Sequence, residues 1–195
     1  MRLKYHELSK NPNPVATGSY LSYSDRQGLL KGGGMEIRVD GPELIRIPPG
    51  NFMVVYRERG GTRFITVGLN IFSLHHMNIA MSEVETHRPP VHKLLANCIN
   101  TLTAGLEKVV IDKFDSQINV YHSHIYVRDR ENNELLAIDA HVTDALIVAI
   151  IEKCAVYVTE DVLNDAGEAR KQYGSSEGKA KNIFENTDWD KVPKA

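Results

Sequence analysis

Apolar and polar positions along the first half of the chain follow the two-residue period of β-strands. Two short strands are predicted between residues 35 and 47, joined by the turn-forming sequence Asp-Gly-Pro at 40–42. Apolar runs at 52–56 and 64–67 then flank a polar segment that contains a Gly-Gly pair. This arrangement predicts a β-hairpin with Gly60 and Gly61 at its turn.

From residue 70 onward the apolar residues recur at the three- and four-residue spacing of helices. One helix is expected over 71–81. A second begins after Pro89-Pro90 and ends at Gly105. Its apolar stripe consists of Leu94, Leu95, Cys98, Ile99 and Leu102. A third, over 145–151, is apolar on nearly every side, which predicts a buried helix.

The second half of the chain also contains strand patterns, at 106–114, 118–130, 134–140 and 155–159. Strands and helices intermingle without a regular βαβ alternation. This order predicts an α+β fold with a mixed or antiparallel sheet, partly barrel-like, packed with three to four helices.

Three parts of the chain differ in composition. We expect an N-terminal extension with short strands over 1–50, a main domain over 51–166, and a mobile C-terminal tail over 167–195 in which the apolar content falls. Trp189 is the tail residue that would dock against the domain. The extensions at both ends are candidates for contacts with a protein partner.

Composition narrows the class of protein. The chain has 195 residues, of which 42% are hydrophobic and 25% charged, as in globular proteins. A formal net charge of −2 excludes a global basic field for nucleic acid, so such a site would have to be local. Cys98 and Cys154 are expected to be small buried hydrophobes in a reducing compartment. With no secretory signal and no membrane-spanning apolar run, we expect a cytoplasmic protein without membrane contact.

Three short motifs follow one another in the second half of the chain: Arg88-Pro89 with His92 and Leu94, Asp139-Ala140 with Asp144-Ala145, and Val156-Tyr157-Val158. In this order, over about residues 51 to 166, the chain resembles the bifunctional nuclease family. It departs from the family pattern at His141-Val142, where the family has Arg-Pro, and at Lys93, where the family has Asp. The resemblance implies an α+β fold, nuclease activity on DNA and RNA, and homo-oligomers.

Asp139 and Asp144 are the expected catalytic and metal-binding carboxylates. Phosphodiester hydrolysis needs an activated water and positive charge near the phosphate, which a divalent cation such as Mg²⁺ or Mn²⁺ can supply. The two residues lie on either side of a predicted helix start, where one loop can bring both carboxylates to a shared rim. The alternative is structural: Asp144 caps or charges the first helical turn, and Asp139 hydrogen-bonds to the loop.

His92, Arg88 and His141 complete the expected site. His92 follows two prolines at a helix start, where it could act as a general base or bind phosphate, or serve as a satisfied polar residue. Arg88 and His141 are expected to bind phosphate, with the positive end of the helix adding to the field. His122 and His124 share one face of a strand and could bind a transition metal, although polar decoration of a half-exposed strand is the default.

Two functions stay open on these residues. The first is a metal-dependent nuclease that hydrolyses phosphodiester bonds in DNA or RNA. The second is a non-catalytic oligomeric or accessory subunit of a larger assembly that keeps the fold. The family resemblance favours the first function, whereas the departures from the family motifs, the acidic net charge and the two extensions motivate the second.

Overall fold

The computed structural model describes residues 34–47, 50–82 and 87–167. The strands expected before residue 34 and the C-terminal tail from 168 onward, with Trp189, lie outside the described residues. Within the described ranges, no helix combines the length and the apolar character needed to cross a membrane.

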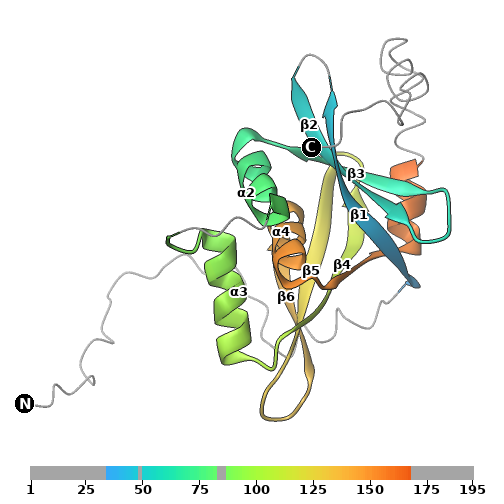
Figure 1. The fold of residues 1–195 in the computed structure, drawn as a ribbon. Coiled ribbons are helices and arrows are strands. Elements are labelled where there is room, and N and C mark those ends of the chain that lie inside the picture. The colour runs from blue at the N-terminus through green and yellow to red at the C-terminus, as the bar shows by residue number, and fades with distance from the viewer. Residues whose placement is uncertain (1–33, 48–49, 83–86, 168–195) are drawn as a thin grey trace, which may run out of the picture. The chain divides into compact units, whose positions relative to one another are not determined.

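Seven strands form one sheet in the order β3-β2-β1-β7-β4-β5-β6 (Figure 1). The strands are β1 (Glu36–Ile47), β2 (Asn51–Glu58), β3 (Phe64–Leu69), β4 (Leu106–Asp115), β5 (Val120–Arg128), β6 (Leu135–His141) and β7 (Ala155–Thr159). All neighbours are antiparallel except β4 and β7, which are parallel. The predicted α+β fold with a mixed sheet is therefore confirmed, as is the β2–β3 hairpin.

The sheet is open, so the expectation of a partly barrel-like sheet is wrong. Its edges are β3 and β6, which do not pair with each other. Helix α4 (Val142–Glu152) contacts both edge strands as well as β4, β5 and β7. The helix thus lies between the two edge strands, which do not pair.

β1 is one continuous strand where two were predicted. Asp-Gly-Pro at 40–42 produces a shift in the β1–β2 register and no chain reversal. Gly41 lies against the neighbouring strand, where a Cβ atom would come within 2.8 Å of Tyr56 Cδ1 and 2.9 Å of the Val55 carbonyl oxygen. The missing side chain thus lets the strand bulge and continue. β1 pairs with β2 on one side and with β7 on the other.

The helices of the described residues gather mainly around α4. They are α2 (Ile71–Ser82), α3 (Val91–Leu102), α4 itself and a helical segment at 160–167. Both α2 and α3 pack against α4, whose other side covers the sheet (Figure 1). The predicted burial of this helix is confirmed, because seven of its residues from Val142 to Ala149 are buried.

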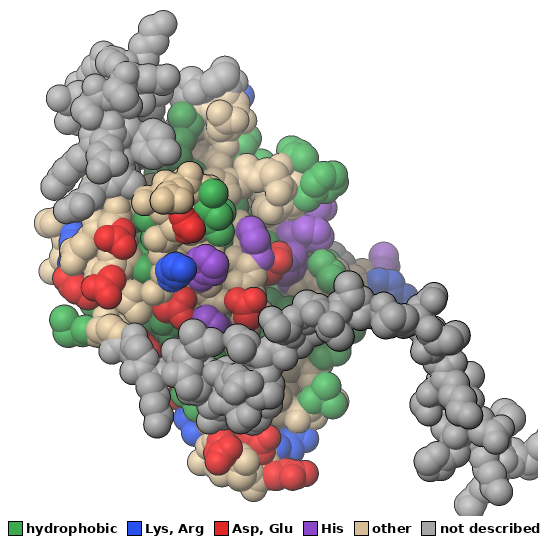
Figure 2. All heavy atoms as spheres, turned by 180° about the vertical axis from the view of Figure 1, so that it is seen from behind, with side chains coloured by type: hydrophobic (Ala, Val, Ile, Leu, Met, Phe, Trp, Pro, Cys, Tyr) green, Lys and Arg blue, Asp and Glu red, His purple; other side chains and the backbone are tan. Residues whose placement is uncertain are grey.

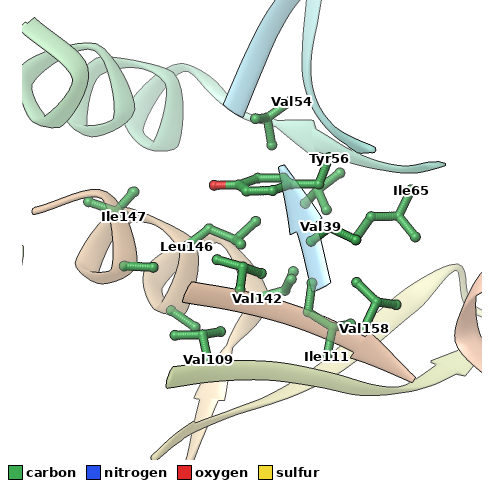
Figure 3. Close-up of a cluster of buried hydrophobic side chains, with 14 of the residues drawn as sticks. Val39, Val54, Tyr56, Ile65, Val109, Ile111, Val142, Leu146, Ile147 and Val158 are labelled. Atoms are coloured by element: carbon green, nitrogen blue, oxygen red, sulfur yellow. The ribbon is translucent and has the colours of Figure 1, made fainter. Parts of the chain in front are cut away.

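The core lies between α4 and one face of the sheet. Figure 3 shows Val142, Leu146 and Ile147 of α4 facing side chains from β1, β2, β3, β4 and β7. Along β4, Val109 and Ile111 are fully buried on this side. Since side chains alternate along a strand, Val110 between them points to the face opposite α4, where it too is buried.

The apolar stripe of α3 faces solvent, contrary to the usual orientation of such a helix. Of the five residues in that stripe only Ile99 is buried, and Cys98 is exposed, so its expected burial is wrong. The buried side of α3 is formed by His92, Ala96 and Ile99. Small Ala96 lets the helix approach α4 closely, while His92 faces a polar group there. The stripe predicts the helix correctly but does not identify the side that packs on the protein.

Candidate functional site

The first turns of α3 and α4 meet through one side-chain hydrogen bond. Nε2 of His92 lies 3.0 Å from Oδ1 of Asp144. His92 is the second residue of α3 and Asp144 the third of α4. The contact therefore joins the Arg-Pro motif to the Asp-Ala motif, which are separated in the sequence and adjacent in the fold.

The two partners differ sharply in exposure. The side chain of His92 is 11% exposed and that of Asp144 is 54% exposed. A carboxylate accepts hydrogen bonds, so Nε2 of a neutral His92 carries the hydrogen. The other ring nitrogen, Nδ1, is buried and has no hydrogen-bond partner among the described residues. This geometry suits His92 to orienting Asp144, and Asp144 is the member that reaches solvent.

A second histidine, which the sequence did not single out, adjoins this pair. The ring centroid of His76 on α2 lies 5.0 Å from that of His92, in an edge-to-face arrangement. His75 follows at 5.6 Å from His76. Burial lowers the pKa of His76, and the neighbouring His92 and His75 lower it further because they oppose a second positive charge. Three helices thus contribute to one polar cluster.

Neither helix end at this cluster has a side-chain cap. The N-cap residues are Pro90 for α3 and His141 for α4, and neither side chain bonds to the first-turn amides. Nδ1 of His141 instead lies 2.9 Å from Oγ1 of Thr143. Asp144 is an acid in the first turn of α4 and does not occupy the N-cap position. Arg88 is exposed and lies two residues before Pro90.

Asp139 is exposed and lies on the face of the sheet opposite α4. In the β5–β6 register Asp139 is opposite His124, and His141 is opposite His122, so these four side chains share that face. Figure 2 shows histidine and acidic side chains gathered on the molecular face that it presents.

His124 has a second acidic neighbour on β4. Nδ1 of His124 lies 2.7 Å from Oδ2 of Asp112, an ion-pair contact without the alignment of a good hydrogen bond. Asp112 raises the pKa of His124 against the opposing effect of burial, and Asp139 adds a smaller contribution. The proposed strand pair of histidines is thus part of a charged surface.

The structure brings His92 and Asp144 together, whereas Asp139 lies opposite His124 on the neighbouring strand. Asp139 lies in β6 and Asp144 in the first turn of α4, which follows β6 directly. No three His, Cys, Asp or Glu side chains in the described ranges are placed to hold a metal ion. The described side chains therefore do not form a preformed metal cage.

Comparison with known families agrees with this arrangement of motifs. The sequence profile of the bifunctional nuclease domain matches residues 54–171, more than half of the chain. The protein is thus an α+β protein of a nuclease-like class, and the chain belongs to the bifunctional nuclease domain family. No curated protein matches it. Both His92 and Asp144 lie within the matched segment.

Proposed function

We propose that the chain hydrolyses phosphodiester bonds of DNA or RNA with the help of Mg²⁺ or Mn²⁺. The observation that carries this proposal is the 3.0 Å contact between His92 and Asp144, which links two family motifs at a solvent-exposed carboxylate. Membership of the family supports the reaction type.

Asp144 is the member of the pair that would contact the metal ion or the attacking water. Oδ1 accepts the hydrogen bond from His92, and more than half of the side chain is open to solvent, so the second oxygen is available to a water or a hard cation. His92 acts as a positioning residue, since its own free nitrogen is enclosed. A bound cation would supply charge stabilisation at the phosphate and lower the pKa of a water.

Phosphate binding is assigned to the two helix starts. The first-turn amides of α3 and α4 are not used by side-chain caps, and a helix N-terminus favours an anion. Arg88 precedes α3 and His141 precedes α4, so each helix start has a nitrogen-bearing side chain beside it. Asp139, exposed on the face of the sheet opposite α4, is a candidate for contacts with the rest of the nucleic acid or with a second cation.

The test is cleavage by the purified protein. Labelled single-stranded DNA and RNA are incubated with Mg²⁺, with Mn²⁺ and with EDTA. The proposal requires cleavage with a divalent ion, its loss in EDTA, and its loss in Asp144→Asn with the fold retained by circular dichroism. Metal-dependent cleavage that persists unchanged in Asp144→Asn would show that the activity resides elsewhere.

A second candidate function rests on α3. Val91, Leu95, Cys98 and Leu102 have the alternating four- and three-residue spacing of a helix-pairing seam, and all are exposed. This face is suited to pairing with α3 of a second copy, as an oligomeric module would require. Such an assembly is compatible with catalysis, because the seam begins beside His92 and leaves the buried side of α3 untouched.

A further inference from the structure

Phe72 is an aromatic side chain that the fold leaves in solvent. It is the second residue of α2 and is 76% exposed. Oδ1 of Asn70 accepts hydrogen bonds from the backbone amides of Phe72 and Ser73, each at 2.9 Å. This N-cap fixes the backbone under the ring, so the exposed aromatic stands at a defined position on the first turn.

The position of Phe72 relates it to the candidate site. Residues four apart lie on the same side of a helix, so Phe72 and His76 are neighbours one turn apart. The ring of His76 lies 5.0 Å from that of His92, which contacts Asp144. Phe72 therefore lies beside the polar cluster, one turn before His76 on α2. Ile71 is 70% exposed but lies about 100° around the helix, above His75.

The surroundings of Phe72 favour a nucleotide over an apolar protein surface. Its neighbours one turn further along the helix are His75 and His76, which are polar. Next to them, α3 starts without a side-chain cap and with no acid in its first turn, while Lys93 adds positive charge there. This charge is complementary to a phosphate. The ring of His76, 5.0 Å from that of His92, adds a polar side chain beside this helix start.

We propose that Phe72 stacks on an unpaired nucleobase of a bound nucleic acid, an assignment that rests on the proposed function for the position of the phosphate. Stacking on an aromatic ring tolerates every base, because each has a π-face, and it requires that the base be out of a duplex. Phe72 would then make the site selective for single strands.

Binding without cleavage provides the test. Fluorescence anisotropy in EDTA measures the affinity of the full chain for a labelled single-stranded oligonucleotide, the same strand in a duplex, and an abasic phosphodiester strand of equal length. Phe72→Ala should weaken binding of the single strand by about 5- to 150-fold, the equivalent of about 1–3 kcal/mol for one stacked base. Phe72→Tyr should restore it, and Ile71→Ala, which removes an equally exposed neighbour, should leave it unchanged.

Three results would overturn the assignment. The first is an equal loss in Phe72→Ala and Ile71→Ala, or an equal loss with the abasic strand. The second is the absence of binding of any strand by the wild-type chain. The third is a wild-type oligomer that becomes a monomer in Phe72→Ala by light scattering, which would place Phe72 in a protein interface. Because EDTA prevents metal-dependent cleavage, a chain that binds as expected but never cleaves would refute the proposed function alone.

Discussion

His92 and Asp144, 52 positions apart in the sequence, hold the starts of α3 and α4 together through a 3.0 Å bond between Nε2 and Oδ1. Removing either side chain leaves the other without its hydrogen-bond partner. A double-mutant cycle with His92→Ala, Asp144→Ala and the double variant should therefore give a coupling of about 0.5–3 kcal/mol in the free energy of unfolding. Urea denaturation measures it. Additive effects of the two single substitutions would mean that the contact contributes nothing to stability.

A charged His124 stabilises the fold through Asp112. Its pKa in the folded state is raised above the ordinary value of 6.5, so the folded protein binds its proton more tightly than the unfolded chain. The resulting stabilisation is fully present below 6.5 and is lost as the pH rises through the folded-state pKa. His124→Gln should thus destabilise the protein more at about pH 5.5 than at about pH 8.5 in urea denaturation.

His122→Gln is the matched control for that measurement. It replaces an exposed histidine two residues away on the same strand and the same face. A pH-dependent loss as large in His122→Gln as in His124→Gln would assign the effect to the general charge of the surface and not to the Asp112 contact.

Glycine is required at position 41 because β1 lies very close to its neighbour β2 there. A Cβ atom there would meet the Tyr56 ring at 2.8 Å and the Val55 carbonyl oxygen at 2.9 Å, and the backbone contact cannot move away like a flexible side chain. Gly41→Ala should cost about 1–3 kcal/mol of unfolding free energy, in the range of overpacked cores. Gly68→Ala, where a Cβ meets nothing within 4 Å, is the control and should be nearly neutral. Equal costs would refute the steric account.

The exposed seam of α3 predicts self-association. Light scattering at micromolar concentration should show an oligomer that Leu95→Glu and Leu102→Glu convert to a monomer, because each places a charge in an apolar interface. Both side chains are exposed in the single chain, so unfolding of the monomer should change little. Ile118→Glu, which places the same charge at an exposed site outside α3, is the control. A wild-type monomer, or dissociation by Ile118→Glu as well, would contradict this use of α3.

The sequence predicts those features of the fold that local pattern determines. The all-round apolar segment from Ala145 to Ile151 predicts a buried helix, and the Gly60-Gly61 pair between two apolar runs predicts a hairpin turn. The composition of Asp-Gly-Pro predicts a turn. In the fold, Gly41 packs against Tyr56 of the neighbouring strand, and β1 continues through a register shift. Composition also cannot show that α4 spans both sheet edges and prevents a barrel.

The candidate site was predictable in part. The motif residues His92 and Asp144 stand out in the sequence, but which acid meets the histidine depends on where α3 crosses α4. His76 has no distinguishing signal, since His75 and His76 lie at equal angles, about 130°, from the centre of the buried Leu74–Met77 side of α2. Only the position of α3 beside α2 decides which of the two joins the cluster.

The most direct test of the central claim compares two carboxylates in one cleavage assay. Initial rates on a labelled single-stranded substrate with Mn²⁺ are measured for the wild type, Asp144→Asn and Asp139→Asn. Because Asp144 contacts His92 and Asp139 does not, Asp144→Asn should lower the rate by about 10²-fold or more, while Asp139→Asn should have a clearly smaller effect. A wild-type rate in Asp144→Asn, or a larger loss in Asp139→Asn, would contradict a site centred on the His92–Asp144 pair.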